Sequence, residues 1–289
     1  MTMRKELSIE AAQSFLKFTS VIAVCAFIAG CSSSSSNLSV DGNASLGNKG
    51  NIASLTQVIK KNPEDPNALN LRGTAYAQIK QYDEAFKDFN AAIAINPNYY
   101  QAYNNRALLY YKTRKYDRAM SDYNEAIRLA PKYHLAYIGR GRLHQRMKRV
   151  SLALADFSHA IDIYGEHPVA YFQRGLIYQK LGQHENAIHD FSTAINLRPN
   201  SSGGPYFARG KSRLELQKYE EAYDDFYVAA RSRKGHFKAW SYRGLAAEKN
   251  NAPEKAARAY RRALGINPSF KPASEGLRRV SGGSNLPRA

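Results

Sequence analysis

Six arginines recur at intervals of 34 or 35 residues, and five are followed sixteen residues later by an aspartate. A row of guanidinium groups could hold phosphates, whereas an arginine paired with a carboxylate on a neighbouring helix would stabilise the fold. We favour pairing, because it satisfies two partly buried charges at once, and we expect no nucleic-acid binding. The sixth arginine, Arg243, has Ala259 in place of the aspartate. The predicted pairs are Arg72 with Asp88, Arg106 with Asp122, Arg140 with Asp156, Arg174 with Asp190 and Arg209 with Asp225.

His184 and His189 flank Glu185 in a segment that nearly matches the HExxH motif of zinc proteases. Two histidines bind one zinc ion from a helix when they are spaced i, i+4. The spacing here is i, i+5, which turns the two rings about 140° apart, so we predict no metal site. Glycine-rich phosphate loops, GxSxG motifs and nucleophile–base pairs are absent from the sequence. We therefore expect neither an enzyme nor a cofactor.

Cys31 is a candidate for covalent lipid attachment. It follows an apolar run over 18–30 that is shorter than the ~20 residues needed to cross a bilayer. The run ends in Ile28-Ala29-Gly30-Cys31, which resembles the bacterial lipobox. The resemblance implies that residues 1–30 are a signal peptide and that Cys31 becomes the acylated N-terminus; an ordinary secretory signal is the alternative. Cys25 would leave with the signal, so we expect no disulfide and no cysteine-ligated metal.

Residues 31–50 are rich in Ser, Asn and Gly, which is typical of a flexible tether. Such a tether would hold the fold about 25 Å from the membrane. Serine follows Cys31, and the enteric sorting rule then implies the outer membrane, with the chain facing the periplasm. The formal net charge of +18 would suggest nucleic acid in a cytoplasm. In a periplasm the available polyanions are phospholipid headgroups, peptidoglycan carboxylates and acidic proteins.

The elements that carry the arginines follow from the pattern around them. When each repeat is numbered from 1, position 8 is Gly or Ala, positions 20 and 27 are Ala, and position 24 is aromatic. Positions 4, 8 and 11 share one face of a first helix, and positions 20, 24 and 27 share one face of a second. Small residues allow two antiparallel helices to approach closely, while the aromatic rings fill the space beside them. The repeats cover 66–99, 100–133, 134–167, 168–202, 203–236 and 237–270.

This pattern resembles the tetratricopeptide repeat (TPR) family over residues 66–268. The resemblance implies an all-α, right-handed superhelical solenoid of six helix pairs over 51–280. We also expect a lone helix over 52–61 ahead of the first pair, a polar capping helix over 271–279 and a disordered tail over 281–289.

Two departures from the repeat stand out. Proline at position 32 is replaced by Gly165 and Lys234 in repeats three and five. Repeat four is one residue too long at 201–205, where we expect a local change in superhelix pitch.

In the TPR family, positions 2, 5, 9, 12 and 13 of the first helix line a concave groove. Here these positions mix apolar anchors with cations, which suits an extended or helical peptide that carries acidic groups. The alternative is that the lysines serve solubility alone. No repeat combines lysine at position 5 with asparagine at position 9, so capture of a chaperone C-terminus is not supported. The candidate groove residues are Asn70, Thr74, Asn104, Leu108, Tyr111, Lys112, Ile138, Arg142, Arg146, Phe172, Gln179, Lys180, Phe207 and Lys211.

The order of lipobox, short tether and six repeats resembles the new-lipoprotein-I type of enteric bacteria. That resemblance implies a scaffold or adaptor for envelope proteins, including peptidoglycan hydrolases or a protease. One alternative is a pilotin-like lipoprotein of pilus or secretion assembly. Another is a direct binder of peptidoglycan or anionic lipid. The sequence leaves the oligomeric state open, a homodimer included.

Overall fold

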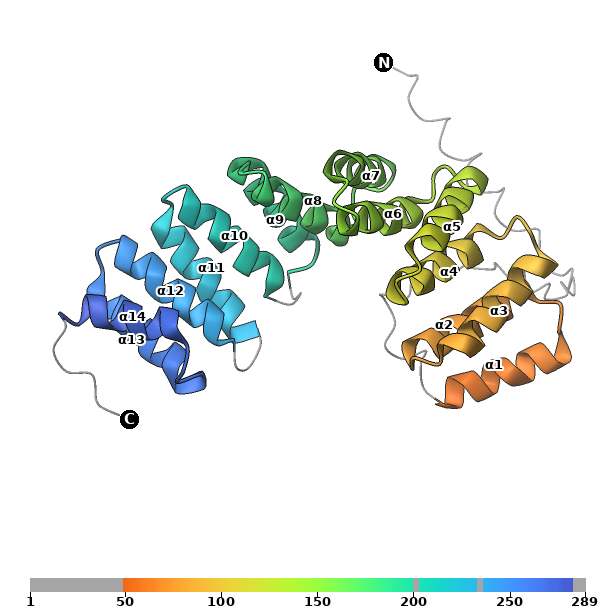
Figure 1. The fold of residues 1–289 in the computed structure, drawn as a ribbon, viewed down its shortest axis with the longest axis horizontal. Coiled ribbons are helices and arrows are strands. Elements are labelled where there is room, and N and C mark those ends of the chain that lie inside the picture. The colour runs from red at the N-terminus through yellow and green to blue at the C-terminus, as the bar shows by residue number, and fades with distance from the viewer. Residues whose placement is uncertain (1–48, 200–202, 233–235, 283–289) are drawn as a thin grey trace, which may run out of the picture. The chain divides into compact units, whose positions relative to one another are not determined.

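The computed structural model describes residues 49–199, 203–232 and 236–282, and this part of the chain is entirely helical (Figure 1). The predicted signal peptide, Cys31, nearly all of the tether, residues 201–202, Lys234 and the tail from residue 283 lie outside the described residues. The fourteen helices of the described part are α1 Lys49–Lys61, α2 Pro66–Gln78, α3 Tyr82–Ile95, α4 Tyr100–Lys112, α5 Tyr116–Leu129, α6 His134–Arg146, α7 Val150–Ile163, α8 Pro168–Lys180, α9 His184–Leu197, α10 Gly204–Glu215, α11 Tyr219–Ser232, α12 Phe237–Lys249, α13 Pro253–Ile266 and α14 Lys271–Val280.

Six consecutive helix pairs, from α2–α3 to α12–α13, form the body of the solenoid, and each helix packs against the next along the chain. The first helix of each pair begins at position 1 of its repeat, except that α10 begins one residue later, at Gly204. Proline supplies the start of α2 and α8, where a backbone N–H would have no helical acceptor. The unpaired helix α1 begins three residues earlier than predicted, and α14 closes the other end one residue later than predicted.

Close contact between a small residue and an aromatic ring holds each pair together. The position-24 rings, such as Phe89 and Phe191, are fully buried. A Cβ added at Gly73 would lie 2.8 Å from Cε1 of Phe89, and one at Gly175 would lie 2.8 Å from Cε1 of Phe191. The two helices of a pair therefore approach as closely as the glycine allows.

The turn inside each pair is closed by backbone geometry. Position 15 adopts the left-handed conformation in all six pairs, with φ between 54° and 76°. The amide after it donates to the carbonyl five residues back, as Gln81 N does to Tyr76 O at 2.9 Å, which completes a Schellman motif. Only one of the six residues is glycine. They are Lys80, Arg114, Lys148, Gly182, Gln217 and Asn251.

The structure forms all five arginine–aspartate pairs, each through two hydrogen bonds of 2.7–3.0 Å. The Asp side chains are 1–9% exposed. The hydrogen bond to the aspartate raises the pKa of Arg72 and Arg174. Each arginine also donates from Nη1 to the preceding helix, for example Arg106 to Asn90 at 2.7 Å and Arg174 to Ser158 at 3.1 Å. One guanidinium thus joins two helices of its own repeat to the repeat before it.

Candidate functional site

A cavity of about 280 Å³ opens where three successive repeats meet. Four of the predicted groove residues line it, and they come in two i, i+4 pairs on the first helices of repeats two and three. Residues four apart on a helix share a face, so α4 and α6 each present one polar and one apolar side chain to the cavity. The four residues are Asn104, Leu108, Ile138 and Arg142.

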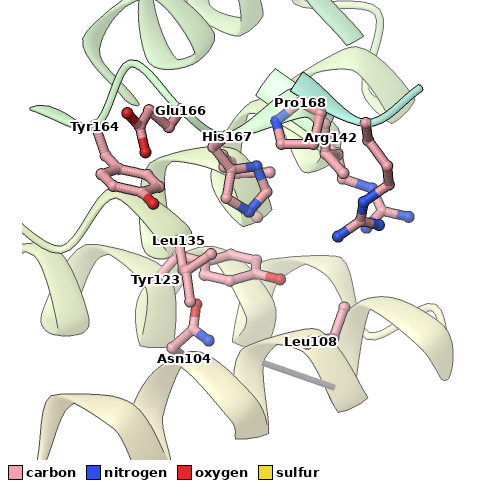
Figure 2. A pocket seen from close by; sticks show the side chains of 13 residues that line it. Asn104, Leu108, Tyr123, Leu135, Arg142, Tyr164, Glu166, His167 and Pro168 are labelled. Atoms are coloured by element: carbon pink, nitrogen blue, oxygen red, sulfur yellow. The ribbon is translucent and has the colours of Figure 1, made fainter. Parts of the chain in front are cut away.

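The opposite wall comes from the turn between α7 and α8. Figure 2 shows Tyr164, Glu166 and His167 on one side of the space and Asn104 and Leu108 on the other. The remaining lining residues are Tyr123, Leu135, Gly139, Pro168, Val169 and Arg198. The repeat positions in the first helices predicted one wall of the cavity but not the other, because turn residues do not follow the helical period.

The cavity lining combines apolar side chains with more cations than anions. Arg142 and Arg198 contribute two cations to the lining, and Glu166 contributes one anion. The guanidinium of Arg142 lies 5.9 Å from the ring centroid of Tyr111, another predicted groove residue. Such a surface can take an apolar side chain and hold a neighbouring carboxylate, as surfaces that recognise peptides do.

Packed rings support the turn wall. The His134 ring lies 4.8 Å from that of Tyr164 and 5.4 Å from that of His167. Burial, together with the neighbouring His167, lowers the pKa of His134 to about 4. His134, which lies on α6 beneath the turn, is therefore neutral at ordinary pH and adds no positive charge there.

The floor of the cavity depends on a glycine that the repeat pattern did not single out. Gly139 on α6 faces Tyr123, and a Cβ there would collide with the phenol ring. Repeats two and six carry tyrosine at position 24, and in both cases glycine stands at position 6 of the next helix, as Gly276 does opposite Tyr260. The larger ring therefore requires a glycine on the helix that follows it.

Burial corrects the prediction for part of the groove. Asn70 and Thr74 are 6% and 1% exposed, and both accept hydrogen bonds from Asn105 Nδ2 on α4, at 3.0 and 3.4 Å. Their polar groups join two adjacent first helices, so these two residues do not offer a surface to a partner. Asn104 and Ile138 are each 5% exposed, and both line the cavity.

The other predicted groove residues divide by what they contact. The Gln179 amide donates to Ala208 O and Ser212 Oγ, both at 2.7 Å, and so links α8 to α10. Phe172 and Phe207 pack against the buried rings of Phe191 and Phe226. The side chain of Lys211 on α10 is partly buried. The exposed members are Lys112, Arg146 and Lys180.

The described part of the chain contains neither a metal-binding cluster nor a membrane-spanning helix. No group of three or more His, Cys, Asp or Glu side chains there is placed to hold a metal ion. His189 is 76% exposed on its side chain. None of the helices in the described ranges is both long and apolar enough to cross a membrane.

Comparison with known proteins bears on the fold. Solved structures with the same architecture include the Cut9–Hcn1 hetero-tetramer of the APC/C, at 20% identity and a TM-score of 0.64, over 81% of this chain and 46% of that chain. YrrB, described as a TPR protein with an unusual peptide-binding site, matches at 24% identity and a TM-score of 0.59, over 66% and 97%. PilF of Pseudomonas aeruginosa matches at 16% identity and a TM-score of 0.66, over 74% and 97%. This chain spans less than half the length of the Cut9–Hcn1 chain. A search of curated proteins gave no match.

Family models for the tetratricopeptide repeat match residues 66–99, 100–133, 168–201 and 207–269, which together exceed half of the chain. The unmatched repeat over 134–167 folds as the pair α6–α7 with the same arginine–aspartate bonds as its neighbours. Repeats of this kind generally provide binding surfaces for other proteins. The chain belongs to the tetratricopeptide repeat family.

Proposed function

We propose that this protein is a lipid-anchored, non-enzymatic scaffold of the bacterial envelope that binds segments of other proteins in the cavity between repeats two and four. The observation that carries the proposal is the cavity itself, which joins Leu108 and Ile138 to the cation of Arg142. These side chains vary from repeat to repeat, whereas the residues that hold the helix pairs recur. Variation at the lining is expected where a surface is shaped for a partner.

The lining indicates the chemistry of the bound segment. A side chain of leucine or phenylalanine size would fill the apolar part, and a carboxylate beside it would lie near Arg142 and Arg198. The peptide-binding site described for YrrB, a protein of the same fold, supports this class of ligand. The partner would thus be an acidic, partly apolar segment of an envelope protein.

The anchor and the partners rest on sequence resemblance. Cys31 would hold the solenoid at the outer membrane, facing the periplasm, and the new-lipoprotein-I arrangement points to peptidoglycan hydrolases or a protease as partners. The likeness to PilF concerns the fold alone at 16% identity, so the pilus-assembly alternative gains no separate support from it.

The test is affinity capture from detergent-solubilised envelopes, with the wild-type chain and two charge-reversed variants. Arg142→Glu places an anion in the cavity, and Arg118→Glu makes the same change on the exposed face of α5. We expect Arg142→Glu to lose a bound hydrolase or protease at least tenfold, because a repelling charge meets the acidic segment. Arg118→Glu should retain it. Capture that is equal for both variants would place the binding surface elsewhere, and recovery of secretin subunits would favour the pilus alternative.

A further inference from the structure

Repeat six lacks the arginine–aspartate pair that the five earlier repeats form. Arg243 has Ala259 where five repeats have aspartate, and Tyr227 where four earlier repeats have the Asn or Ser that accepts from Nη1. Its guanidinium instead lies 4.0 Å from the ring centroid of Tyr223, 4.3 Å from that of Tyr227 and 5.4 Å from that of Trp240. Aromatic faces stabilise the cation without neutralising it. Burial lowers the pKa of Arg243, which still carries its charge.

The neighbouring helix α13 adds four exposed cations at positions 19, 22, 25 and 26 of the repeat. The four are Lys255, Arg258, Arg261 and Arg262. None of them forms an ion pair or donates a hydrogen bond to another described residue. Glu254 is the one acidic residue of α13, and the nearby Glu248 is already paired with Arg279. No other repeat has more than one cation at these positions.

The three arginines among these cations line an open hollow of about 560 Å³, whose other lining residues are Gly265 and Ile266. A Cβ at Gly265 would meet nothing within 4 Å, so the space beside the arginines is free. Trp240 borders the same face, because its ring lies 5.9 Å from the Arg262 guanidinium. The hollow is open and cationic, unlike the more enclosed cavity of the candidate groove, and it therefore suits a surface that carries many anions better than a single inserted side chain.

We propose that the cationic face formed by Arg258, Arg261 and Arg262 on α13, beside the half-buried Trp240 of α12, binds the anionic headgroups of a phospholipid membrane. Each cation near an anionic bilayer adds attraction, and three arginines on one exposed helix face add theirs together. A membrane presents many phosphates in one plane, so several arginines on one exposed helix face can each contact a headgroup at the same time. This interaction is separate from the groove and would give the anchored solenoid a second contact with the bilayer.

The test uses the full chain with Cys31→Ala, so that lipidation does not dominate, and vesicles of phosphatidylcholine with or without phosphatidylglycerol. Trp240 is the only tryptophan of the chain, so its fluorescence reports on this face directly. The variant replaces Arg258, Arg261 and Arg262 by glutamine. The matched control replaces Lys61, Lys80 and Lys132, three exposed cations outside both the groove and repeat six, by glutamine, and it lowers the net charge by the same amount.

We expect the parent chain to bind phosphatidylglycerol vesicles in a salt-sensitive way, with a change in Trp240 emission. The α13 triple variant should bind at least tenfold more weakly, and the control should stay within about threefold of the parent. A second variant with lysine at the three α13 positions keeps the charge and should keep binding. Equal loss in the α13 triple and the control, loss in the lysine variant, or no preference for phosphatidylglycerol would overturn the proposal. Binding of an acidic peptide at α13 in place of vesicles would also overturn it.

Discussion

Each of the five paired arginines contacts two other helices, the second helix of its own repeat and the helix before that repeat. These contacts join three helices at one residue. Two donors of Arg174 hold Asp190 on α9, and a third reaches Ser158 on α7. A solenoid depends on contacts between neighbours, because no repeat buries enough surface alone. The repeated arginine therefore acts in the stability of the fold, as its spacing predicted.

Replacing Asp190 by alanine tests that role. The carboxylate is 1% exposed on its side chain, and its loss leaves the largely buried Arg174 guanidinium without a counterion. We expect the free energy of unfolding to fall by about 3 kcal/mol, measured by urea denaturation. Glu84→Ala, which removes the exposed partner of Lys87, is the control and should change little. If both substitutions had the same small effect, the ion pairs would not hold the repeats together.

His134 predicts how stability responds to pH. Its pKa is lowered to about 4 by burial and by His167, whereas an unfolded histidine titrates near 6.5. Between these values the unfolded chain binds more protons, so stability is greatest above about pH 6.5 and decreases as the pH falls toward 4. His134→Asn should reduce this decrease in the melting temperature between pH 7 and 5. An unchanged slope in His134→Asn would contradict the assignment.

At the scale of elements, tyrosine and glycine act together across adjacent helices. Gly276 on the capping helix α14 faces the Tyr260 ring, whose hydroxyl donates to Glu248 Oε2 at 2.6 Å. Glu248 also accepts from Arg279 on α14, and these bonds lower the pKa of the carboxyl group. One buried ring and one ion pair therefore attach the end of the solenoid.

Gly276→Val should detach the capping helix, because the added side chain collides with the Tyr260 ring. We expect a loss of about 2 kcal/mol or more and faster proteolysis within α14. Gly265→Ala is the matched control on α13. A Cβ there meets nothing within 4 Å, so alanine should stabilise the helix by up to about 1 kcal/mol. Intact protection of α14 in Gly276→Val would show that the cap does not depend on this contact.

The helices were predictable from the sequence because small and aromatic residues recur at fixed positions. The ion pairs followed for the same reason. The turns inside the pairs could not be predicted in this way, because position 15 adopts a left-handed backbone but carries glycine only at Gly182. Leu108 and Arg142 were among the predicted groove residues because they lie on a periodic helix face. Glu166 and His167, which also line the cavity, come from a turn without period and were not predicted. Asn70 and Thr74 were misassigned, because helical spacing cannot distinguish a groove residue from one buried by the neighbouring first helix.

For the whole molecule we propose three separate regions, which are a lipid anchor at Cys31, a groove that binds partners and a cationic face on α13. The anchor is tested by Cys31→Ala in cells. Since a diacylglyceryl group is the predicted attachment, the variant should move from the membrane fraction to the soluble fraction after lysis, while a serine-tract variant such as Ser33→Ala should stay bound. Membrane retention of Cys31→Ala equal to that of the parent would show that the lipobox interpretation is wrong.

The proposed binding of partners in the cavity formed by α4, α6 and the turn between α7 and α8 is tested by site-specific photo-crosslinking in living cells. A crosslinker at Leu108, on the cavity wall, is compared with one at Ser121, exposed on α5. We predict an adduct with an envelope hydrolase or protease from position 108 that disappears when Arg142→Glu is added, and no such adduct from position 121. An identical adduct from both positions, or one from position 108 that persists with Arg142→Glu, would show that partners do not bind in this cavity.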